Sequence, residues 1–580
     1  MILRSACTTV LFLGFAGILA LATPLYGNAD SRDERVDALY DAMTPDERLA
    51  QLLLVAWQGE TPSRLIMQWI ERRGLGGVKV FGWNADNTTT LARSIGRLQE
   101  AATARSVGDS DGIPLLTATD QEGGWVRHIR GQTSTSAGNM AIGATGLPHD
   151  AYRTGRYIAA ELRMLGINLN FAPTVDVYRN SEADVIGSRA FGDTPEQVGI
   201  LGLGFFRGHE NERVVAAAKH FPGHGNAVGD SHGLLPAVTE SLDELYESDL
   251  LPYRMLMREG IPAVLSAHVA FPGISDSPTP ATLSPEIMQD LLRDTLGFEG
   301  IAITDDMHMG GATLYAERQG WSFGELQVRA IEAGNDMLVL SQTPALNGEI
   351  WSALKDAYEQ RPEFRARVEE SVKRILSVKD EYLRNDSAVP PIPDTDEVAR
   401  FFPHEEAQAF FENHARRAVS VVRGEGLPLD PDEYDRVVLA GNVRNFFLEA
   451  GRHFPEATES RFSYSPRDYS LPEERRAVRE DAANADLIVF GLSNRNSLEV
   501  LQELEAYAES VVVVSTLSPL LLAEADFVDR AVAVYGLGRE SFRAGFDVLT
   551  GNMDAEGTVP LQALREPAPQ HGRGNREMQQ

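Results

Sequence analysis

The stretch VAAAKHFPGHG at residues 215–225 decides the fold. It opens with an apolar run, reaches two polar residues at Lys219 and His220, and then enters a turn marked by proline and glycine. A short continuous apolar run is typical of a parallel strand covered on both faces. Polar groups at the carboxyl end of such a strand are typical of the functional edge of an α/β fold.

Further runs of this kind alternate with amphipathic stretches between residues 35 and 385. The strand candidates are residues 51–57, 77–81, 115–120, 168–172, 215–220, 263–268, 300–305 and 336–340. Strands alternating with helices in this number predict a (β/α)8 TIM barrel, with a doubly wound open sheet as the alternative. A barrel would bring the polar residues at the strand ends to one face: Asp120, Lys219, His220, His268 and Asp305.

The rest of the chain divides around this barrel. We expect a signal peptide at 1–29, the barrel at 30–384, a linker rich in proline at 385–403 and a disordered tail at 566–580. Residues 404–565 are expected to form a smaller α/β sandwich domain with a parallel sheet. Its strand candidates are 437–440, 487–491, 511–515 and 531–535.

Composition narrows the classes of function. The net charge of −31 argues against nucleic acid and anionic membranes as partners. The apolar run at 10–22 is short for a membrane anchor, which favours cleavage and an exported protein, periplasmic or secreted, with no stable membrane span. Cys7 is the only cysteine, so the mature chain would have neither a disulfide nor a cysteine-built metal site. The oligomeric state stays open.

Residues 219–232 concentrate groups that transfer protons. Asp230 and His232 are separated by one residue, so in an extended loop their side chains lean to the same side. A carboxylate beside an imidazole fixes the tautomer of the ring and prepares it to deliver a proton near neutral pH. The alternative is a polar loop whose histidines are satisfied by neighbours.

Three more motifs accompany this loop: DQEGG at 120–124, IGSRAFG at 186–192 and ITDDMHM at 303–309. Together with KHFPGHG and the later Asp-Ser-His, they resemble glycoside hydrolase family 3, and within it the two-domain form of the β-N-acetylglucosaminidase branch. The segment 544–560 resembles the end of that family's second domain. The resemblance implies an enzyme with no metal or organic cofactor.

The resemblance also implies roles for single residues. Asp305 would be the nucleophile, and His232 would be the acid/base, oriented by Asp230. Asp306 is a rival nucleophile, but it would point to the opposite side of the strand, so we expect a structural carboxylate there. The residues implied in sugar binding are Asp120, Arg189, Lys219 and His220. For His224 and His268 a structural role and a place in the pocket are both open.

One position departs from the branch. Where the branch usually has a sugar-contacting arginine, this chain has His128, flanked by Arg127 and Arg130. Either arginine is a possible substitute. Trp125 is a further difference, and an aromatic side chain there could stack on a sugar or simply pack.

The function expected from these residues is that of a retaining exo-β-N-acetylglucosaminidase. It would remove terminal non-reducing N-acetylglucosamine from peptidoglycan fragments or chitin oligosaccharides through a covalent glycosyl-enzyme intermediate. The alternatives are a phosphorylase of the same branch, a β-glucosidase or β-xylosidase of the same family, and a non-catalytic sugar-binding wall protein.

Overall fold

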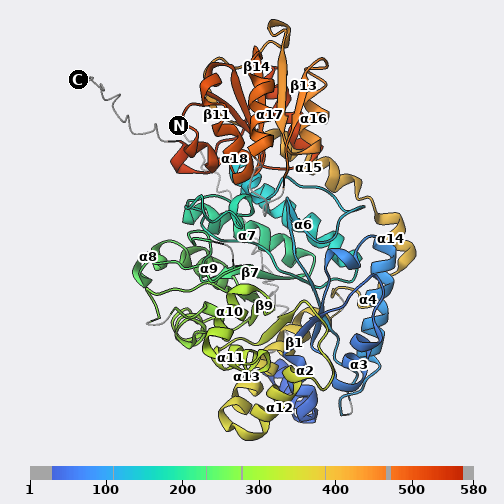
Figure 1. Ribbon diagram of the computed structural model, residues 1–580. Helices are drawn as coiled ribbons and strands as arrows, with labels where there is room; N and C mark the ends of the chain where they lie inside the picture. Colours follow the sequence, from blue (N-terminus) through green and yellow to red (C-terminus); the bar gives the residue numbers. More distant parts are fainter. Residues whose placement is uncertain are drawn as a thin grey trace, which may run out of the picture.

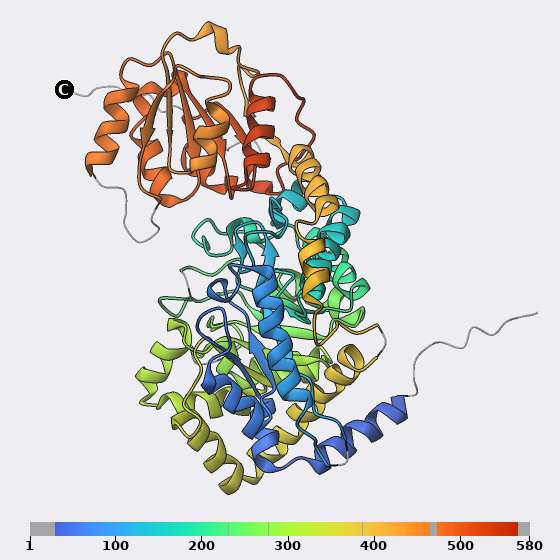
Figure 2. The same cartoon turned by 90° about the vertical axis from the view of Figure 1, so that its right-hand side faces the viewer.

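The computed structural model describes residues 29–108, 110–229, 231–275, 278–385, 387–464 and 472–565. These residues form a barrel and a smaller α/β unit that stands at one end of it (Figures 1 and 2). The expected signal peptide, apart from Ala29, and the expected tail at 566–580 lie outside the described residues.

The barrel is a closed ring of eight parallel strands in the order β1-β10-β9-β8-β7-β6-β3-β2. Pairing of β1 with β10, with Leu54 opposite Val339, closes the ring, so the predicted TIM barrel is confirmed and the open sheet is wrong. The strands are β1 Leu53–Ala56, β2 Gly77–Lys79, β3 Leu116–Thr119, β6 Leu169–Asn170, β7 Val215–Phe221, β8 Ala263–Ser266, β9 Ile301–Asp306 and β10 Met337–Leu340.

Helices surround the ring because each presents one apolar face to it. Local signals set their ends: Ser63 caps the start of α3 by accepting from the Ile66 N–H, and Gly74 ends that helix with a positive φ of 69°. The helices are α1 Ala29–Ala42, α2 Pro45–Gln51, α3 Arg64–Arg73, α4 Thr88–Thr103, α5 Asn139–Thr145, α6 Pro148–Met164, α7 Pro195–Asn211, α8 Leu242–Glu247, α9 Leu250–Arg258, α10 Gly310–Gln319, α11 Phe323–Ala333, α12 Glu349–Gln360 and α13 Pro362–Leu383. Among the described helices, none has the length and apolar character needed to cross a membrane.

Two short strands after β3 form a hairpin at the carboxyl end of the ring. They are β4 Gln121–Gly123 and β5 Val126–Arg127, which pair antiparallel. The turn between them contains Gly123 and Gly124, with φ values of 92° and 60° that glycine adopts without strain. This hairpin carries several residues of the site described below.

The smaller unit has a six-stranded sheet in the order β11-β16-β15-β14-β12-β13. All its pairs are parallel except β11 with β16, so the predicted parallel sheet is confirmed with one antiparallel edge. The sequence did not reveal the two edge strands, and β13 reads TESR with only one buried residue. The connecting helix α14 Thr395–Phe401 packs against α4 and α6 of the barrel. The elements of the smaller unit are α15 Glu405–Ala418, β11 Ser420–Gly424, β12 Val437–Gly441, α16 Arg444–Ala450, β13 Thr458–Arg461, α17 Pro472–Ala482, β14 Leu487–Leu492, α18 Arg495–Gln502, β15 Val511–Ser515, β16 Arg530–Ala533 and α19 Arg539–Leu549.

An apolar cluster joins the two units. It combines buried side chains of the barrel loops, among them Met140 and Ile186, with Tyr535 and Leu561 of the smaller unit. Backbone hydrogen bonds cross the same boundary, from Thr558 N to Ala144 O at 2.9 Å and from Asp193 N to Pro560 O at 3.3 Å. The segment at 186–192 is therefore supported by both units.

Candidate active site

A cavity of about 300 Å³ lies at the carboxyl ends of the barrel strands. It gathers residues from β2, β3, β7 and β9 and from the loops that follow them. The lining includes every described residue to which the sequence assigned a role: Asp120, Arg189, Lys219, His220, His232 and Asp305. The seventh, Asp230, lies outside the described residues.

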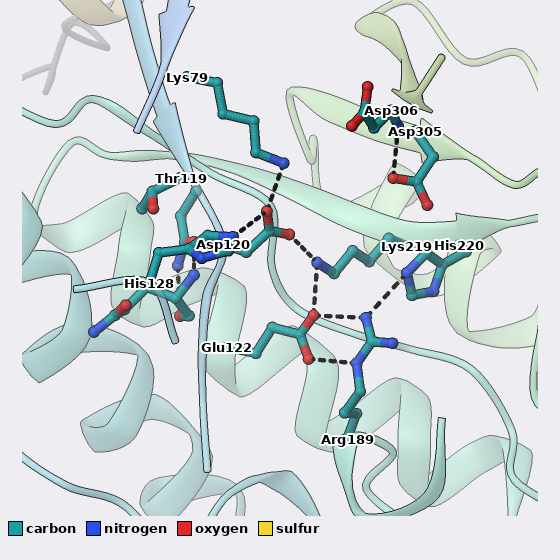
Figure 3. Close-up of polar contacts among 12 residues, drawn as sticks. Lys79, Thr119, Asp120, Glu122, His128, Arg189, Lys219, His220, Asp305 and Asp306 are labelled. Atoms are coloured by element: carbon teal, nitrogen blue, oxygen red, sulfur yellow. Dashed lines mark hydrogen bonds and ion pairs between the residues drawn. The ribbon is translucent and has the colours of Figure 1, made fainter. Parts of the chain in front are cut away.

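Asp120 is held between two lysines at one side of the cavity (Figure 3). Its Oδ2 lies 2.7 Å from Lys79 Nζ, and its Oδ1 lies 2.6 Å from Lys219 Nζ. Burial raises the pKa of Asp120, but the two lysines outweigh it and hold the pKa well below its usual value. Sequence reasoning gave no role to Lys79, the last residue of β2.

Glu122 continues this chain of charges. It accepts two hydrogen bonds from Arg189, from Nε at 2.9 Å and from Nη2 at 2.7 Å, and its Oε1 lies 2.6 Å from Lys219 Nζ. Burial raises the pKa of this carboxyl, but Arg189 and Lys219 lower it to about 2. The only sequence signal for Glu122 was its place in the DQEGG motif, two residues after Asp120 and so on the same side of an extended chain.

His220 links Arg189 to a buried carboxylate that sequence reasoning missed. Its Nδ1 lies 2.8 Å from Asp176 Oδ2, and its Nε2 lies 3.1 Å from Arg189 Nη2. Because a guanidinium only donates, Nε2 accepts and Nδ1 carries the hydrogen. Both ring nitrogens of His220 thus face protein partners, and its role in sugar binding stays a prediction.

The cationic side chains still have hydrogens to offer a ligand. An ammonium has three N–H groups and a guanidinium five. The described contacts use two of those of Lys219 and one of those of Lys79. Arg189 uses four, including one from Nη1 to Val185 O at 2.9 Å. The spare donors and the oxygens of Asp120 suit a ligand rich in hydroxyl groups.

Asp305 differs from the other carboxylates that line this cavity. Its Oδ1 accepts a hydrogen bond of 2.8 Å from the Asp306 amide, and among the described residues it forms no ion pair. Burial raises the pKa of Asp305, but His220, His268 and Lys79 outweigh it, so the pKa lies below its usual value. The side chain is therefore an ionised carboxylate near neutral pH with an oxygen available to a ligand.

Asp306 has a structural environment. Its Oδ1 accepts hydrogen bonds from the backbone of His308 at 3.2 Å and of Ser341 at 3.1 Å, which fix the turn after β9 against the loop after β10. Side-chain hydrogen bonds from His308 and Ser341 contribute to lowering the pKa of Asp306 to about 2 against the effect of burial. This arrangement fits the structural carboxylate expected there.

His232 reaches the cavity from the loop between β7 and α8. The loop is anchored beside Asp305, because Gly310 N donates to His232 O at 3.1 Å and Gly311 N donates to Ser231 O at 2.9 Å. Both glycines are sterically required: a Cβ on Gly310 would lie 2.9 Å from His232 O. On Gly311 it would lie 2.8 Å from the backbone oxygen of His268.

The three candidates to replace the arginine of the branch line different cavities. His128 lines the cavity and its Nε2 lies 3.4 Å from Asp120 Oδ2, whereas Arg127 and Arg130 line a different cavity. Trp125, 40% exposed, lines both. Alternation along β5 accounts for this, because neighbouring residues of a strand point to opposite sides.

The two histidines left open by the sequence have different surroundings. His268 is buried, with Nδ1 3.0 Å from Thr282 Oγ1 and Nε2 3.1 Å from the backbone oxygen of Asp306. Its ring therefore forms a hydrogen bond with the last residue of β9, which is a structural role. His224 lines the cavity, and its backbone amide donates a hydrogen bond to Asp176 at 2.7 Å. Burial, together with the nearby His220, lowers the pKa of the His224 ring to about 4.

A closed parallel barrel with a charged cavity at the carboxyl ends of its strands has the architecture of a barrel enzyme with its active site in the usual place. The chain belongs to glycosyl hydrolase family 3, whose N terminal domain matches residues 44–378. This confirms the resemblance found in the sequence motifs.

Individual relatives agree with this assignment. The chain is 39% identical over 261 residues to beta-hexosaminidase A of Pseudoalteromonas piscicida, a match that covers 42% of this chain and 43% of that protein. It is 38% identical over 246 residues to a beta-hexosaminidase of Methylococcus capsulatus, covering 42% of this chain and 71% of the relative. The solved structure of a family 3 beta-N-acetylglucosaminidase from Paenibacillus superposes with a TM-score of 0.77 at 28% identity, over 90% of this chain and 99% of that one.

Proposed function

We propose that this chain is a retaining exo-β-N-acetylglucosaminidase. The observation that carries the proposal is that Asp305, ionised and without an ion pair among the described residues, lines the same cavity as His232. The other two carboxylates in that lining, Asp120 and Asp306, are each tied to protein groups. A nucleophilic carboxylate and a proton donor around one sugar are the minimum for a two-step displacement.

The proposed reaction has two steps. Asp305 attacks the anomeric carbon while His232 protonates the glycosidic oxygen, which releases the aglycone and leaves a glycosyl ester on Asp305. His232, now a base, takes a proton from water, and the water oxygen attacks the anomeric carbon to free both sugar and carboxylate. Asp230, from its place in the sequence, would orient the imidazole and stabilise its charged form.

The substrate class rests on two supports. A cavity of about 300 Å³ is at the lower end of the range for small-molecule sites, which suits a single terminal sugar and therefore exo action. The names of the relatives, hexosaminidases and a beta-N-acetylglucosaminidase, support an N-acetylated amino sugar in that place. Terminal N-acetylglucosamine of peptidoglycan fragments or chitin oligosaccharides fits both. The apolar run within residues 1–29 supports export of the enzyme to the compartment where such polymers lie.

A panel of nitrophenyl glycosides tests the proposal. We expect release of nitrophenol from the β-N-acetylglucosaminide, and far slower release from the β-glucoside and β-xyloside. Product analysis in phosphate buffer should give free N-acetylglucosamine with the β configuration at early times, as retention requires. Sugar 1-phosphate as the main product would establish phosphorolysis instead, and faster cleavage of the glucoside would reassign the sugar.

A further inference from the structure

A second cavity, of about 610 Å³, lies between the barrel and the smaller unit. The barrel contributes the hairpin turn and the loop at 135–136, and the smaller unit contributes Asn445 and residues 537–540 at the start of α19. Figure 2 shows the smaller unit standing directly over the barrel at this boundary. The function proposed above makes no use of this cavity.

The cavity is rich in arginine, although the whole chain carries a net charge of −31. Arg127, Arg130, Arg539 and Arg543 line it, with two glutamates. One of these, Glu540, has a pKa that burial raises. The start of α19 adds partial positive charge to the same wall.

The two arginines beside the hairpin turn form no ion pair with the described carboxylates. Arg127 Nη1 donates to Ser134 O at 3.1 Å, and Arg130 Nε donates to the backbone oxygen of Arg127 at 3.2 Å. Neither forms an ion pair with any described carboxylate. Burial lowers the pKa of Arg127 and the neighbouring Arg130 lowers it further, while Glu540 and Glu161 offset this only in part. A bound anion would relieve both effects.

A buried glutamate holds the two arginines that the smaller unit contributes to the cavity. Glu449, with a side chain 1% exposed, lies 2.7 Å from Arg539 Nη2 and 3.4 Å from Arg543 Nε. It also lies 3.3 Å from Arg452 Nε, and Arg452 is not part of the lining. One buried carboxylate thus positions two guanidinium groups at the wall.

The hairpin forms the wall between the two cavities. Val126 and His128 face the barrel cavity, Arg127 faces the second one, and Trp125 lines both. A substrate whose terminal sugar lies beside Asp305 would therefore extend its leaving group past Trp125, where an aromatic ring offers a face to a sugar.

We propose that the second cavity is the aglycone site and that it selects aglycones that carry carboxylates. The proposal rests on the function proposed above and extends it from the sugar cleaved to the group released. Planar guanidinium groups bind carboxylates in pairs of hydrogen bonds, whereas a neutral chitin-type aglycone would leave Arg127 and Arg130 without an ion pair.

The test compares substrates that share a terminal β-N-acetylglucosamine. They are a disaccharide whose second sugar carries a lactyl carboxylate, the methyl ester of that carboxylate, and the amide of that carboxylate with a short peptide that has free carboxylates. We expect kcat/KM to be higher for the free acid than for the ester by about tenfold or more, and the preference to shrink as salt rises. A preference seen only with the peptide-bearing substrate also supports the site and assigns the carboxylate to the peptide.

Variants of the full chain locate the preference. In the double variant Arg127→Gln, Arg543→Gln, kcat/KM for the free acid divided by kcat/KM for the ester should fall towards one. Both values are measured on the same protein. Arg452→Gln is the matched control, because it also removes an arginine from Glu449 but not from the lining, and it should keep the ratio. If the double variant does not fold, Arg130→Gln, exposed on the hairpin, should lower the ratio part of the way.

Two outcomes overturn the proposal: equal kcat/KM for the acid, the ester and the peptide-bearing substrate in the unaltered chain, or a preference that the arginine variants retain. Failure of the proposed function has a different signature, namely no cleavage of the aryl N-acetylglucosaminide. In that event, calorimetric binding of acid and ester to Asp305→Ala decides the anion site on its own, and equal affinities would overturn it.

Discussion

The two cavities on either side of the β4–β5 hairpin use charge in opposite ways. In the barrel cavity, Lys79, Lys219 and Arg189 are each within 2.9 Å of a carboxylate oxygen, so each cation is paired and its side chain is fixed before a ligand arrives. In the cavity between the units, Arg127 and Arg130 have no such partner among the described residues. The first arrangement suits neutral hydroxyl groups, and the second suits an anion, because two of its arginines form no ion pair.

The largest loss of activity is expected when the unpaired carboxylate of the barrel cavity is removed. Asp305→Ala should lower kcat for the aryl N-acetylglucosaminide by at least about 10⁴-fold, since the nucleophile acts in both steps. Asp306→Asn is the matched control next door and should lose far less activity, because Asn keeps an acceptor for the His308 and Ser341 amides. Comparable losses in the two variants would contradict the assignment of Asp305.

The acid/base role separates substrates by their leaving groups. His232→Ala should slow cleavage of a disaccharide by about 10² to 10⁴-fold, because a basic leaving oxygen needs the proton. Cleavage of a dinitrophenyl glycoside should slow much less in its first step. Steady-state and burst kinetics on both substrates measure the difference, and equal losses would refute the role.

Removing Glu122 would unbalance the barrel cavity. Its pKa in the folded chain is about 2 against an ordinary 4.5, so the carboxylate contributes about 3 kcal/mol to the free energy of unfolding at pH 7. A carboxyl with a lowered pKa contributes fully above its unfolded pKa and loses that contribution as pH falls. The destabilisation in Glu122→Gln should therefore be about 1 kcal/mol smaller at pH 4 than at pH 7.

Urea unfolding curves at the two pH values measure this effect. Glu556→Gln, at an exposed position, serves as the control and should change the free energy of unfolding little at either pH. A Glu122→Gln effect that is independent of pH would show that packing, rather than charge, accounts for it.

A smaller effect is expected where the His232 loop is anchored. Gly311→Ala would force a Cβ to within 2.8 Å of the His268 oxygen and displace the loop, which should cost about 10- to 100-fold in kcat/KM for the disaccharide. At Gly233, in the same loop, a Cβ would meet nothing within 4 Å, so Gly233→Ala should retain nearly full activity. Unchanged activity in Gly311→Ala would show that the loop adjusts.

The sequence predicted those parts of the molecule that local patterns determine. The apolar runs located all eight barrel strands. The motifs named six residues that the fold brings to one cavity. Asp176 could not be predicted, because no motif surrounds it and only folding brings it beneath His220. The edge strands β11 and β13 escaped because an exposed edge lacks the continuous apolar run of a buried strand.

The apolar cluster shared by the two units has a consequence for dissecting the protein. Met140, Ile186, Tyr535 and Leu561 are nearly inaccessible to water only while both units are present. The isolated barrel, residues 30–384, would expose an apolar surface beside the segment that carries Arg189, and it would be prone to self-association. Truncation at the linker would thus remove packing that supports the barrel loops as well as the smaller unit itself.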